Sequence, residues 1–386
     1  MKRILLIAAL LLQCIAVTAQ RAYNDLKISI MTCAHGKEIY SSFGHCAFRA
    51  QSVSRGIDRV YNYGTFNYHQ PFFVLKFVRG FLDYSVSSYD YIIFQLEYLK
   101  EKREVHEQLL NLSPEQAQAV YDFLEWNVLE KNRNYKYNFL EDNCATRIRD
   151  VLKNACGNDI IYPDTTYAFT LRDAIDERIE EMPWFRLGIT LLMGLPVDKN
   201  ATAMTAMFLP DYVYSTINAT QIMHNGKAEP IVKRNSIVIR ADKPVSRTDF
   251  LTYLSPTLLL WLLFAWWAWR TYKEINTHTY HTGGDKAWIF ILGMFGILFL
   301  VMWFLTEHTV TANNMNLLWA LPTHVVAAWA VKSTKPFWRH YYKVSAMITA
   351  AMLILAPIIP QHYDPAFYPI LLITTMRLAR IGWRDN

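Results

Sequence analysis

His45-Cys46-Ala47-Phe48-Arg49-Ala50-Gln51 is followed, after the turn residues Ser54-Arg55-Gly56, by Arg59-Val60-Tyr61-Asn62-Tyr63-Gly64. Two apolar and aromatic runs on either side of a glycine-containing turn predict a β-hairpin. Pairing around this turn puts Asn62 opposite Ala47. Asn62 then lies on the same face as His45, because side chains alternate along a strand. The hairpin therefore predicts that His45 and Asn62 are neighbours.

The segments around the hairpin predict an α+β domain. Leu26–Thr32 and Tyr91–Leu99 are apolar enough to form further strands. Ser113-Pro114-Glu115-Gln116 is a capping box with Pro at the first helical position, so a helix is expected from there to Lys131. Ala145–Asn154 has the apolar spacing of a second helix. We expect a small antiparallel sheet with helices on one side.

Cys144 comes directly before the second predicted helix and follows the strand-like run Tyr135–Leu140. The unpaired N–H groups and the dipole of a helix N-terminus favour a thiolate, so we expect the pKa of Cys144 to be depressed. A nucleophilic thiol also needs an adjacent base. His45 is the candidate base, and Asn62 is placed to orient its ring.

Both ends of the chain have the composition of membrane-directed segments. Lys2 and Arg3, the apolar run Ile4–Leu12 and the small residues Val17-Thr18-Ala19 predict a signal peptide over residues 1–19. Residues 20–250 are then an exported domain, and residues 251–386 form a membrane domain. Five segments of about spanning length follow: Tyr253–Trp269, Ala287–Leu305, Met315–Val331, Val344–Ile359 and Phe367–Trp383.

The distribution of basic residues predicts the orientation. Lys and Arg occur after the first and third segments and in the tail, whereas Thr306–Asn314 and Pro360–Ala366 have none. By the positive-inside rule the C-terminus is cytoplasmic, and the signal peptide independently places the exported domain on the outer side of the membrane. Ten basic and five acidic residues in 251–386 account for +5 of the formal charge of +6. The exported part therefore has no excess of positive charge for nucleic acid.

Other assignments of the cysteines and histidines remain open. The four cysteines after the signal peptide permit two disulfides, such as Cys144–Cys156 and Cys33–Cys46. His35 and His69 are alternative bases, and Cys33 is an alternative nucleophile. Motifs for a P-loop, a dinucleotide site, a serine nucleophile elbow or a zinc protease are absent, so we expect no cofactor and no metal.

Three runs resemble the Lnb N-terminal periplasmic domain family, over about Leu26–Glu180. They are Thr32-Cys33-Ala34-His35-Gly36-Lys37-Glu38-Ile39-Tyr40-Ser41-Ser42-Phe43-Gly44-His45-Cys46-Ala47-Phe48-Arg49, then Asp58-Arg59-Val60-Tyr61-Asn62-Tyr63-Gly64-Thr65-Phe66, and Asp142-Asn143-Cys144-Ala145-Thr146-Arg147. More distantly, a His before Asn-Cys is similar to circularly permuted NlpC-type papain-like thiol enzymes, a group that includes lecithin:retinol acyltransferase. Ala145-Thr146 stands where those acyltransferases have Glu-His. The resemblance implies a permuted papain-like fold with His45 as base and Cys144 as nucleophile.

Two functions are expected from these features. The first is a cysteine hydrolase or acyltransferase that acts on an amide or ester of a lipid-linked or wall-linked substrate, with Cys144, His45 and Asn62 as catalytic residues. Its expected substrate-binding residues are Asn143, Arg147, Tyr63, His308 and Asn313. The second, implied by the family name, is a non-catalytic maturation factor for a secreted glycosidase. The expected partners are accordingly a membrane lipid or envelope substrate, or a secreted enzyme client.

Overall fold

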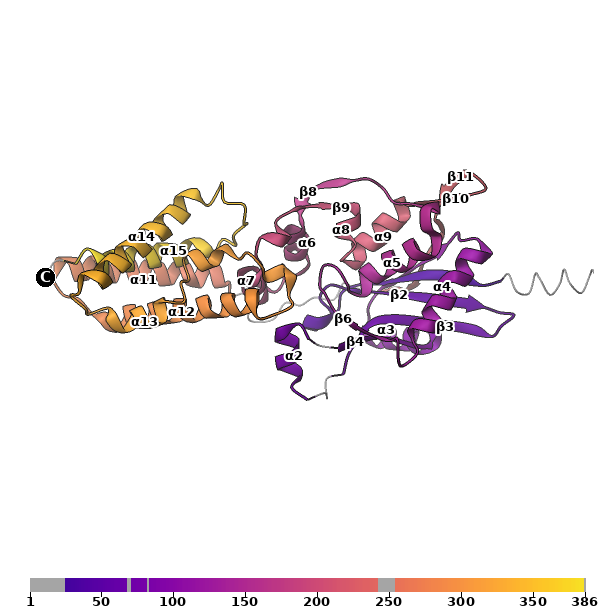
Figure 1. Cartoon of the computed structure of the whole chain (residues 1–386), viewed down its shortest axis with the longest axis horizontal. Helices are drawn as coiled ribbons and strands as arrows, with labels where there is room; N and C mark the ends of the chain where they lie inside the picture. The colour runs from indigo at the N-terminus through magenta and orange to yellow at the C-terminus, as the bar shows by residue number, and fades with distance from the viewer. Residues whose placement is uncertain (1–24, 68–70, 82, 242–253, 385–386) are drawn as a thin grey trace, which may run out of the picture. The chain divides into compact units, whose positions relative to one another are not determined.

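The computed structural model describes residues 25–67, 71–81, 83–241 and 254–384, so the predicted signal peptide lies outside the described residues. The chain divides into two units (Figure 1). The first contains residues 1–77, 81–167 and 201–246, and the second contains residues 78–80, 168–200 and 247–386. Each unit has its own hydrophobic core.

The first unit has a sheet and several helices. Its elements, in chain order, are β1 Lys27–Cys33, β2 His45–Ser52, β3 Ile57–Thr65, α2 Phe73–Arg79 (which ends in the second unit), β4 Asp83–Asp90, α3 Tyr91–Glu101, β5 Val105–Leu110, α4 Pro114–Asn127, β6 Asn134–Lys136, α5 Cys144–Cys156, β7 Ile160–Ile161, α8 Ala203–Ala206, α9 Pro210–Ala219, β10 Gln221–His224, β11 Lys227–Pro230 and β12 Val232–Ile239. The chain passes between the units within β8 (Thr166–Thr170) and β9 (Asn200–Thr202).

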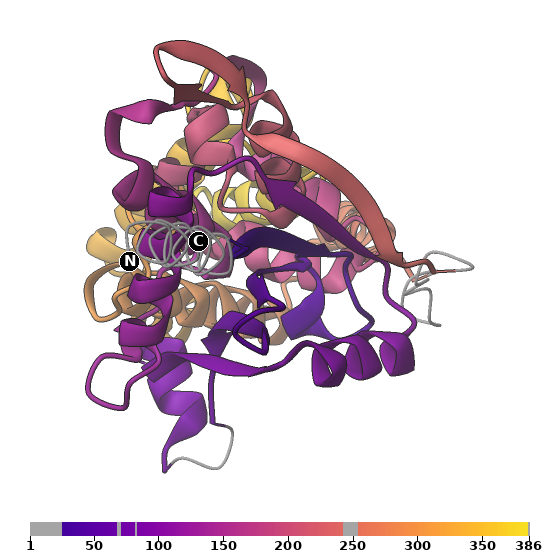
Figure 2. The same cartoon turned by 90° about the vertical axis from the view of Figure 1, so that its right-hand side faces the viewer.

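Seven strands form the main sheet in the order β12-β5-β1-β2-β3-β4-β6, and every neighbouring pair is antiparallel. The long strand β12 forms one edge (Figure 2). The predicted hairpin is confirmed as β2 and β3, and Ala47 lies opposite Asn62 as expected. The strand predicted at Leu26–Thr32 is β1.

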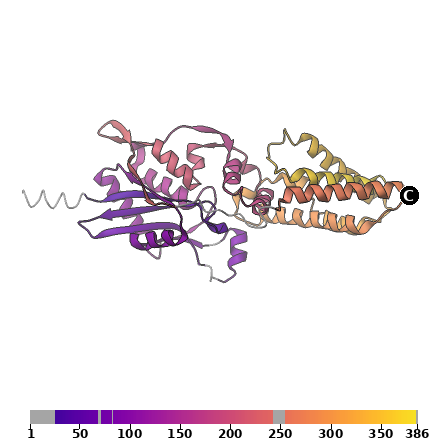
Figure 3. The ribbon, with the colours of Figure 1, turned by 180° about the vertical axis from the view of Figure 1, so that it is seen from behind.

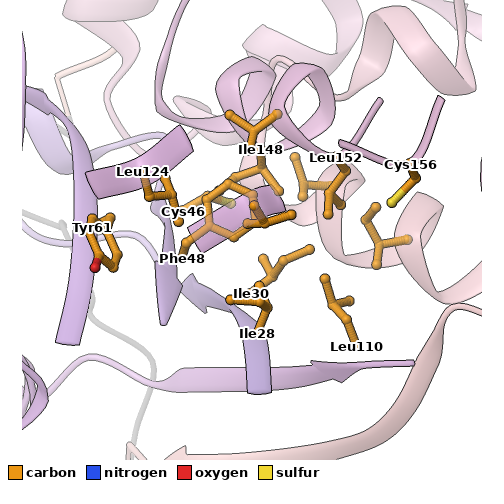
Figure 4. Packing of buried hydrophobic residues seen from close by; sticks show 14 of the residues in the cluster. Ile28, Ile30, Cys46, Phe48, Tyr61, Leu110, Leu124, Ile148, Leu152 and Cys156 are labelled. Atoms are coloured by element: carbon orange, nitrogen blue, oxygen red, sulfur yellow. The ribbon is translucent and has the colours of Figure 1, made fainter. Parts of the chain in front are cut away.

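Helices pack against both faces of this sheet, so the expectation of helices on one side is wrong. On one face, α4 and α5 bury Leu124 and Ile148 against Ile30 and Phe48 (Figure 4). On the other face, α3 buries Phe94 against the strands. Each fully buried aliphatic or aromatic side chain of this kind contributes about 1.5–3 kcal/mol to folding.

The strand predicted at Tyr91–Leu99 is wrong, because this segment forms helix α3. Its aromatic and β-branched residues favour a strand by propensity. However, Tyr91, Phe94 and Tyr98 are spaced three and four residues apart, and all three are buried. That spacing places them on one side of a helix, and packing against the sheet decides the conformation.

Both helices predicted after residue 110 are present. The Ser113 side chain caps α4 and Gln116 completes the capping box, although α4 ends at Asn127 rather than Lys131. Helix α5 begins at Cys144, one residue before the predicted start. Its apolar side, including Ile148 and Leu152, faces the core.

The second unit is helical. Its elements are α6 Leu171–Arg178, α7 Pro183–Leu192, α11 Pro256–Asn276, α12 Thr282–Phe304, α13 His324–Ala327, α14 Pro336–Leu355 and α15 Phe367–Gly382, with short 3-10 turns between them. The four long helices α11, α12, α14 and α15 run alongside one another (Figure 3). In the part of the chain that the structure describes, α12 alone is both long and apolar enough to span a membrane.

The third predicted span, Met315–Val331, is wrong as a continuous helix. It consists of the 3-10 turn Met315–Leu318, helix α13 and the 3-10 turn Ala328–Ala330. Pro322 lacks the N–H that a helix interior needs. The segment also packs backbone against backbone on α12, since a Cβ added at Gly296 would lie 2.0 Å from the Ala320 carbonyl oxygen.

The segment 168–200, expected within the exported domain, groups with the helical unit. Arg172 is fully buried, and its guanidinium binds both carboxylate oxygens of Asp198, at 2.7 and 2.9 Å. The Asn314 side chain donates to the Leu191 carbonyl at the end of α7, at 2.8 Å. These buried polar contacts make α6 and α7 part of the helical unit.

A buried charge cluster joins three of the long helices. Arg377 on α15 binds Asp285 on α12, at 2.6 Å, and Glu274 on α11, at 3.0 Å. Glu274 also binds Arg270, so two cations face two anions. Arg377 and Asp285 are both fully buried. A charge-balanced cluster of this kind is costly to break one residue at a time.

Candidate functional site

Cys144 is the first residue of α5, and Asn143 fixes the start of that helix. The Asn143 side-chain oxygen accepts from the amides of Ala145 and Thr146, at 2.8 and 2.9 Å. Its nitrogen donates to the carbonyls of Phe139 and Phe208, at 2.7 and 2.9 Å. Asn143 is buried, and both polar atoms of its side chain already hold the backbone around Cys144. Its role in substrate binding stays a prediction.

The thiol of Cys144 is half-buried, and burial raises its pKa above the ordinary value. The backbone amides of Cys46, Cys144 and Ala145 and the charge of Arg103 act in the opposite direction. Burial outweighs them, so the expected depression of the pKa is wrong. Cys144 is therefore a neutral thiol in the resting protein at pH 7.

His45 is the first residue of β2, and its Nε2 lies 3.1 Å from the Oδ1 of Asn62. Burial lowers the pKa of His45 to about 4; the Arg103 charge adds to this effect and Asn62 opposes it. The imidazole is therefore neutral at pH 7. With the Asn62 oxygen as acceptor, Nε2 carries the hydrogen and Nδ1 is left as the basic nitrogen.

Gly44 gives His45 its position. Its φ of +78° lies in the left-handed region, and an added Cβ would stand 2.8 Å from the Cys33 carbonyl oxygen. Any other residue would both strain the backbone and collide with β1. The turn into β2 therefore requires glycine at this point.

Cys144 and His45 lie at the same end of the sheet. A Cβ added at Gly64, near the end of β3, would lie 3.8 Å from the Cys144 Cβ, and the Cys46 amide acts on the thiol. Cys46 faces the α5 side, whereas Ala47, and with it His45, faces the α3 side. The structure contains no hydrogen bond between Cys144 and His45, both of which it describes. The two groups therefore share one end of the sheet, on opposite faces, without a hydrogen bond between them.

Arg103 is a site residue that the sequence reasoning missed. It is 6% exposed, and its Nε donates to the Ala34 carbonyl at 2.8 Å, directly after β1. Its Nη1 binds Glu101 at 2.8 Å, and its Nη2 has no partner among the described residues. Arg103 acts electrostatically on both Cys144 and His45. No local motif marks it, because its closeness depends on the pairing of β1 with β5.

Two other predicted binding residues are held by structural contacts. Tyr63 is fully buried, and its hydroxyl donates to Asn127 at 2.8 Å; its role in substrate binding stays a prediction. Arg147 binds Asp142 through Nη2 at 2.7 Å and stacks over Tyr135 at 4.4 Å. Arg147 remains partly exposed, and its role in binding stays a prediction.

His308 and Asn313 belong to the second unit, in the segment after α12. His308 precedes a 3-10 turn, and its carbonyl accepts from the hydroxyl of Thr311 at 2.9 Å. Asn313 has a φ of +52°, which Asn tolerates better than most residues. Their role in substrate binding stays a prediction.

The structure also bears on the alternative disulfides, nucleophile and bases. All four described cysteines are free. Cys144 and Cys156 are the two ends of α5, about 18 Å apart at 1.5 Å per residue, which is too far for a disulfide. Cys33 and Cys46 pack into cores on opposite faces of the sheet. Burial also raises the pKa of Cys33 to about 12, which disfavours it as a nucleophile. Of the alternative bases, His35 lies just after β1, and His69 lies outside the described residues.

Two family models match the chain. The Lnb N-terminal periplasmic domain matches residues 15–172, and the Lnb transmembrane domain matches residues 246–384. Comparison with curated proteins and with solved structures finds no match. The matches agree with the division of the chain into a mixed sheet-and-helix part and a helical part. The chain is therefore a membrane protein of the Lnb family, with a periplasmic N-terminal domain and a transmembrane C-terminal domain.

Proposed function

We propose that the protein is a cysteine hydrolase or acyltransferase of the bacterial inner membrane. Its substrate would be an amide or ester of a lipid-linked or wall-linked molecule. The observation that supports this most is the placement of Cys144, at a helix start, at the same end of the sheet as a His45 that Asn62 orients. An antiparallel sheet that carries the histidine before a cysteine-bearing helix is also what a permuted papain-like fold requires.

The resting protonation states favour a base-assisted attack. Cys144 is a thiol and His45 is a neutral imidazole. Nδ1 of His45 would take the thiol proton as the sulfur attacks the acyl carbonyl, and would return it to the leaving amine or alcohol. The resulting thioester is resolved by water or by an acceptor amine or hydroxyl. Amides near Cys144 and the charge of Arg103 would stabilise the oxyanion.

A second candidate is a non-catalytic maturation factor for a secreted client enzyme. The raised pKa of Cys144 and the absence of a Cys144–His45 hydrogen bond between these described residues favour it. In that case Cys144 is a small core side chain. The geometry of Asn62 and His45 then has no chemical purpose, which is why we prefer the enzyme.

An acyl-adduct experiment separates the two candidates. Full-length protein would be incubated with envelope lipid extract, and the Cys144 peptide would be analysed by mass spectrometry. The enzyme hypothesis expects an acyl mass on Cys144 that neutral hydroxylamine removes. Cys144→Ser should lose it, whereas Cys156→Ser, a change at another core cysteine, should keep it. An unmodified Cys144 peptide with every extract and with intact folding would refute the enzyme.

We further propose that the C-terminus is cytoplasmic and that five segments cross the membrane. The basic loops support this orientation. A reporter that works only in the cytoplasm should be active when it is fused after Asn386. A reporter that works only outside the cytoplasm should be active when it is inserted in Thr306–Asn314. The reverse pattern would overturn the topology. Alanine variants of Arg147, His308 and Asn313 in the acyl-adduct assay test their predicted binding roles.

A further inference from the structure

Helix α2 and the residues that flank it present apolar side chains to the outside. Phe72 is 78% exposed, Leu75 57%, Val78 39% and Phe81 36%. Leu75 and Val78 are three residues apart and therefore share a side of the helix. Single exposed apolar residues are ordinary on a protein surface, but four within ten positions of the chain are not. The helix stands out from the sheet (Figures 1 and 2).

Basic residues accompany this apolar group. Lys76 and Arg79 lie on the same short helix, and the segment from Phe72 to Phe81 contains no acidic residue. Aromatic and aliphatic side chains interleaved with Lys and Arg are typical of helices that lie in a membrane interface. The apolar side enters the acyl boundary, and the cationic ends remain among the phosphates.

The last turn of α2 is attached to the end of a membrane helix. Residues 78–80 belong to the second unit, and the Arg79 carbonyl accepts from the Glu307 amide at 3.0 Å. A Cβ added at Gly80 would lie 3.2 Å from the Glu307 Cβ, so the two segments are in close contact. Glu307 follows α12 by three residues.

The length of α12 indicates where this contact lies across the membrane. Its 23 residues span about 35 Å, slightly more than the hydrocarbon core. Both ends of α12 therefore reach the interfaces. Phe304 and Leu305, at the end near Glu307, are each 64% exposed, as lipid-facing residues are. Because α2 is within the match to the periplasmic domain, this interface is the periplasmic one.

We propose that Phe72–Phe81 is a monotopic membrane anchor that inserts into the periplasmic leaflet beside α12. The occupant of its apolar surface is the phospholipid of that leaflet, with Lys76 and Arg79 near the phosphates. This inference concerns the surface alone and is independent of any reaction at Cys144.

Spin-label accessibility of the full chain in nanodiscs tests this anchor. The nanodiscs would contain zwitterionic and anionic phospholipid, and Cys144→Ser would remove the half-buried native thiol. Leu75→Cys and Phe72→Cys carry the label in turn. Val53→Cys is the matched control, because Val53 is an equally exposed apolar residue, at 83%, in the turn at the other end of β2 and β3.

A label at position 75 or 72 should be several-fold more accessible to oxygen, relative to an aqueous nickel complex, than the label at position 53. Purified protein contains no partner, so such protection can come only from lipid. Equal aqueous accessibility at positions 72, 75 and 53 would overturn the anchor and leave the surface to a protein partner. The readout does not use catalysis, so it is unaffected by failure of the proposed enzyme.

Discussion

Replacing Asn62 by alanine tests most directly the hypothesis that Asn62 orients His45 as the base for Cys144. Asn62 is 6% exposed, and its oxygen is the partner of His45 Nε2 at 3.1 Å. Asn62→Ala leaves that N–H unpaired in a buried position, which costs about 1–3 kcal/mol. If the bond holds the ring in its working orientation, this cost corresponds to a rate loss of about 5- to 150-fold.

The rate to measure is that of Cys144 alkylation by iodoacetamide at pH 7, followed in the full-length protein by mass spectrometry. Asn235→Ala is the matched control, because Asn235 is an exposed Asn whose side chain takes part in one hydrogen bond, as the donor to Asn218 at 2.9 Å. The control should react like the parent. His45→Ala should lose at least as much rate as Asn62→Ala.

The double variant decides whether the two residues act together. If Asn62 works only through His45, the variant with both changes should react no more slowly than His45→Ala. Additive losses would show that Asn62 acts by another route. A folded Asn62→Ala protein that is alkylated within about twofold of the parent rate, against the 5-fold minimum expected, would show that Asn62 does not position His45 for this reaction.

Three further predictions concern the same end of the sheet. Asn143→Ala removes the cap of α5 and should lower the free energy of unfolding by at least about 1 kcal/mol in denaturant titration; an unchanged midpoint would contradict the capping role. Gly44→Ala should lower the melting temperature and slow Cys144 alkylation, since its Cβ would meet the Cys33 carbonyl; a variant as stable as the parent would show that the turn adapts. The part of the Cys144 alkylation rate that depends on His45 should persist well below pH 6.5 and fall as the pH drops through about 4, because that pKa is lowered in the folded protein; a loss near 6.5 would contradict a buried imidazole. In the same range, from 6.5 down to 4, stability should decline, since only the unfolded chain takes up the proton.

Local patterns were sufficient to predict much of the first unit. The turn at Ser54–Gly56 determines the pairing of β2 with β3, so the Asn62–His45 neighbourhood followed from the alternation of side chains. The capping box at Ser113 likewise predicted α4. These features depend on residues that are close in sequence.

The errors come from contacts that are distant in sequence. Tyr91–Leu99 becomes a helix because one side of it packs on the sheet. Met315–Val331 is broken because it packs closely against α12. Contacts distant in sequence also explain a grouping that the sequence does not indicate: the segment 168–200 joins the helical unit through contacts such as Asn314 to Leu191, more than a hundred residues away. Burial raises the pKa of Cys144, where the sequence predicted a lowered one, and this burial depends on the whole core.

The cluster of Arg377, Asp285 and Glu274 has a consequence for biosynthesis. Glu274 already has Arg270 as a partner on its own helix, but Asp285 is made 92 residues before Arg377, the arginine that binds it. Until α15 arrives, α12 must keep the Asp285 carboxylate hydrated near the membrane surface, since an unpaired charge in lipid is costly. The last helix therefore completes the bundle, and a chain truncated before Arg377 should be recognised as unfinished and degraded.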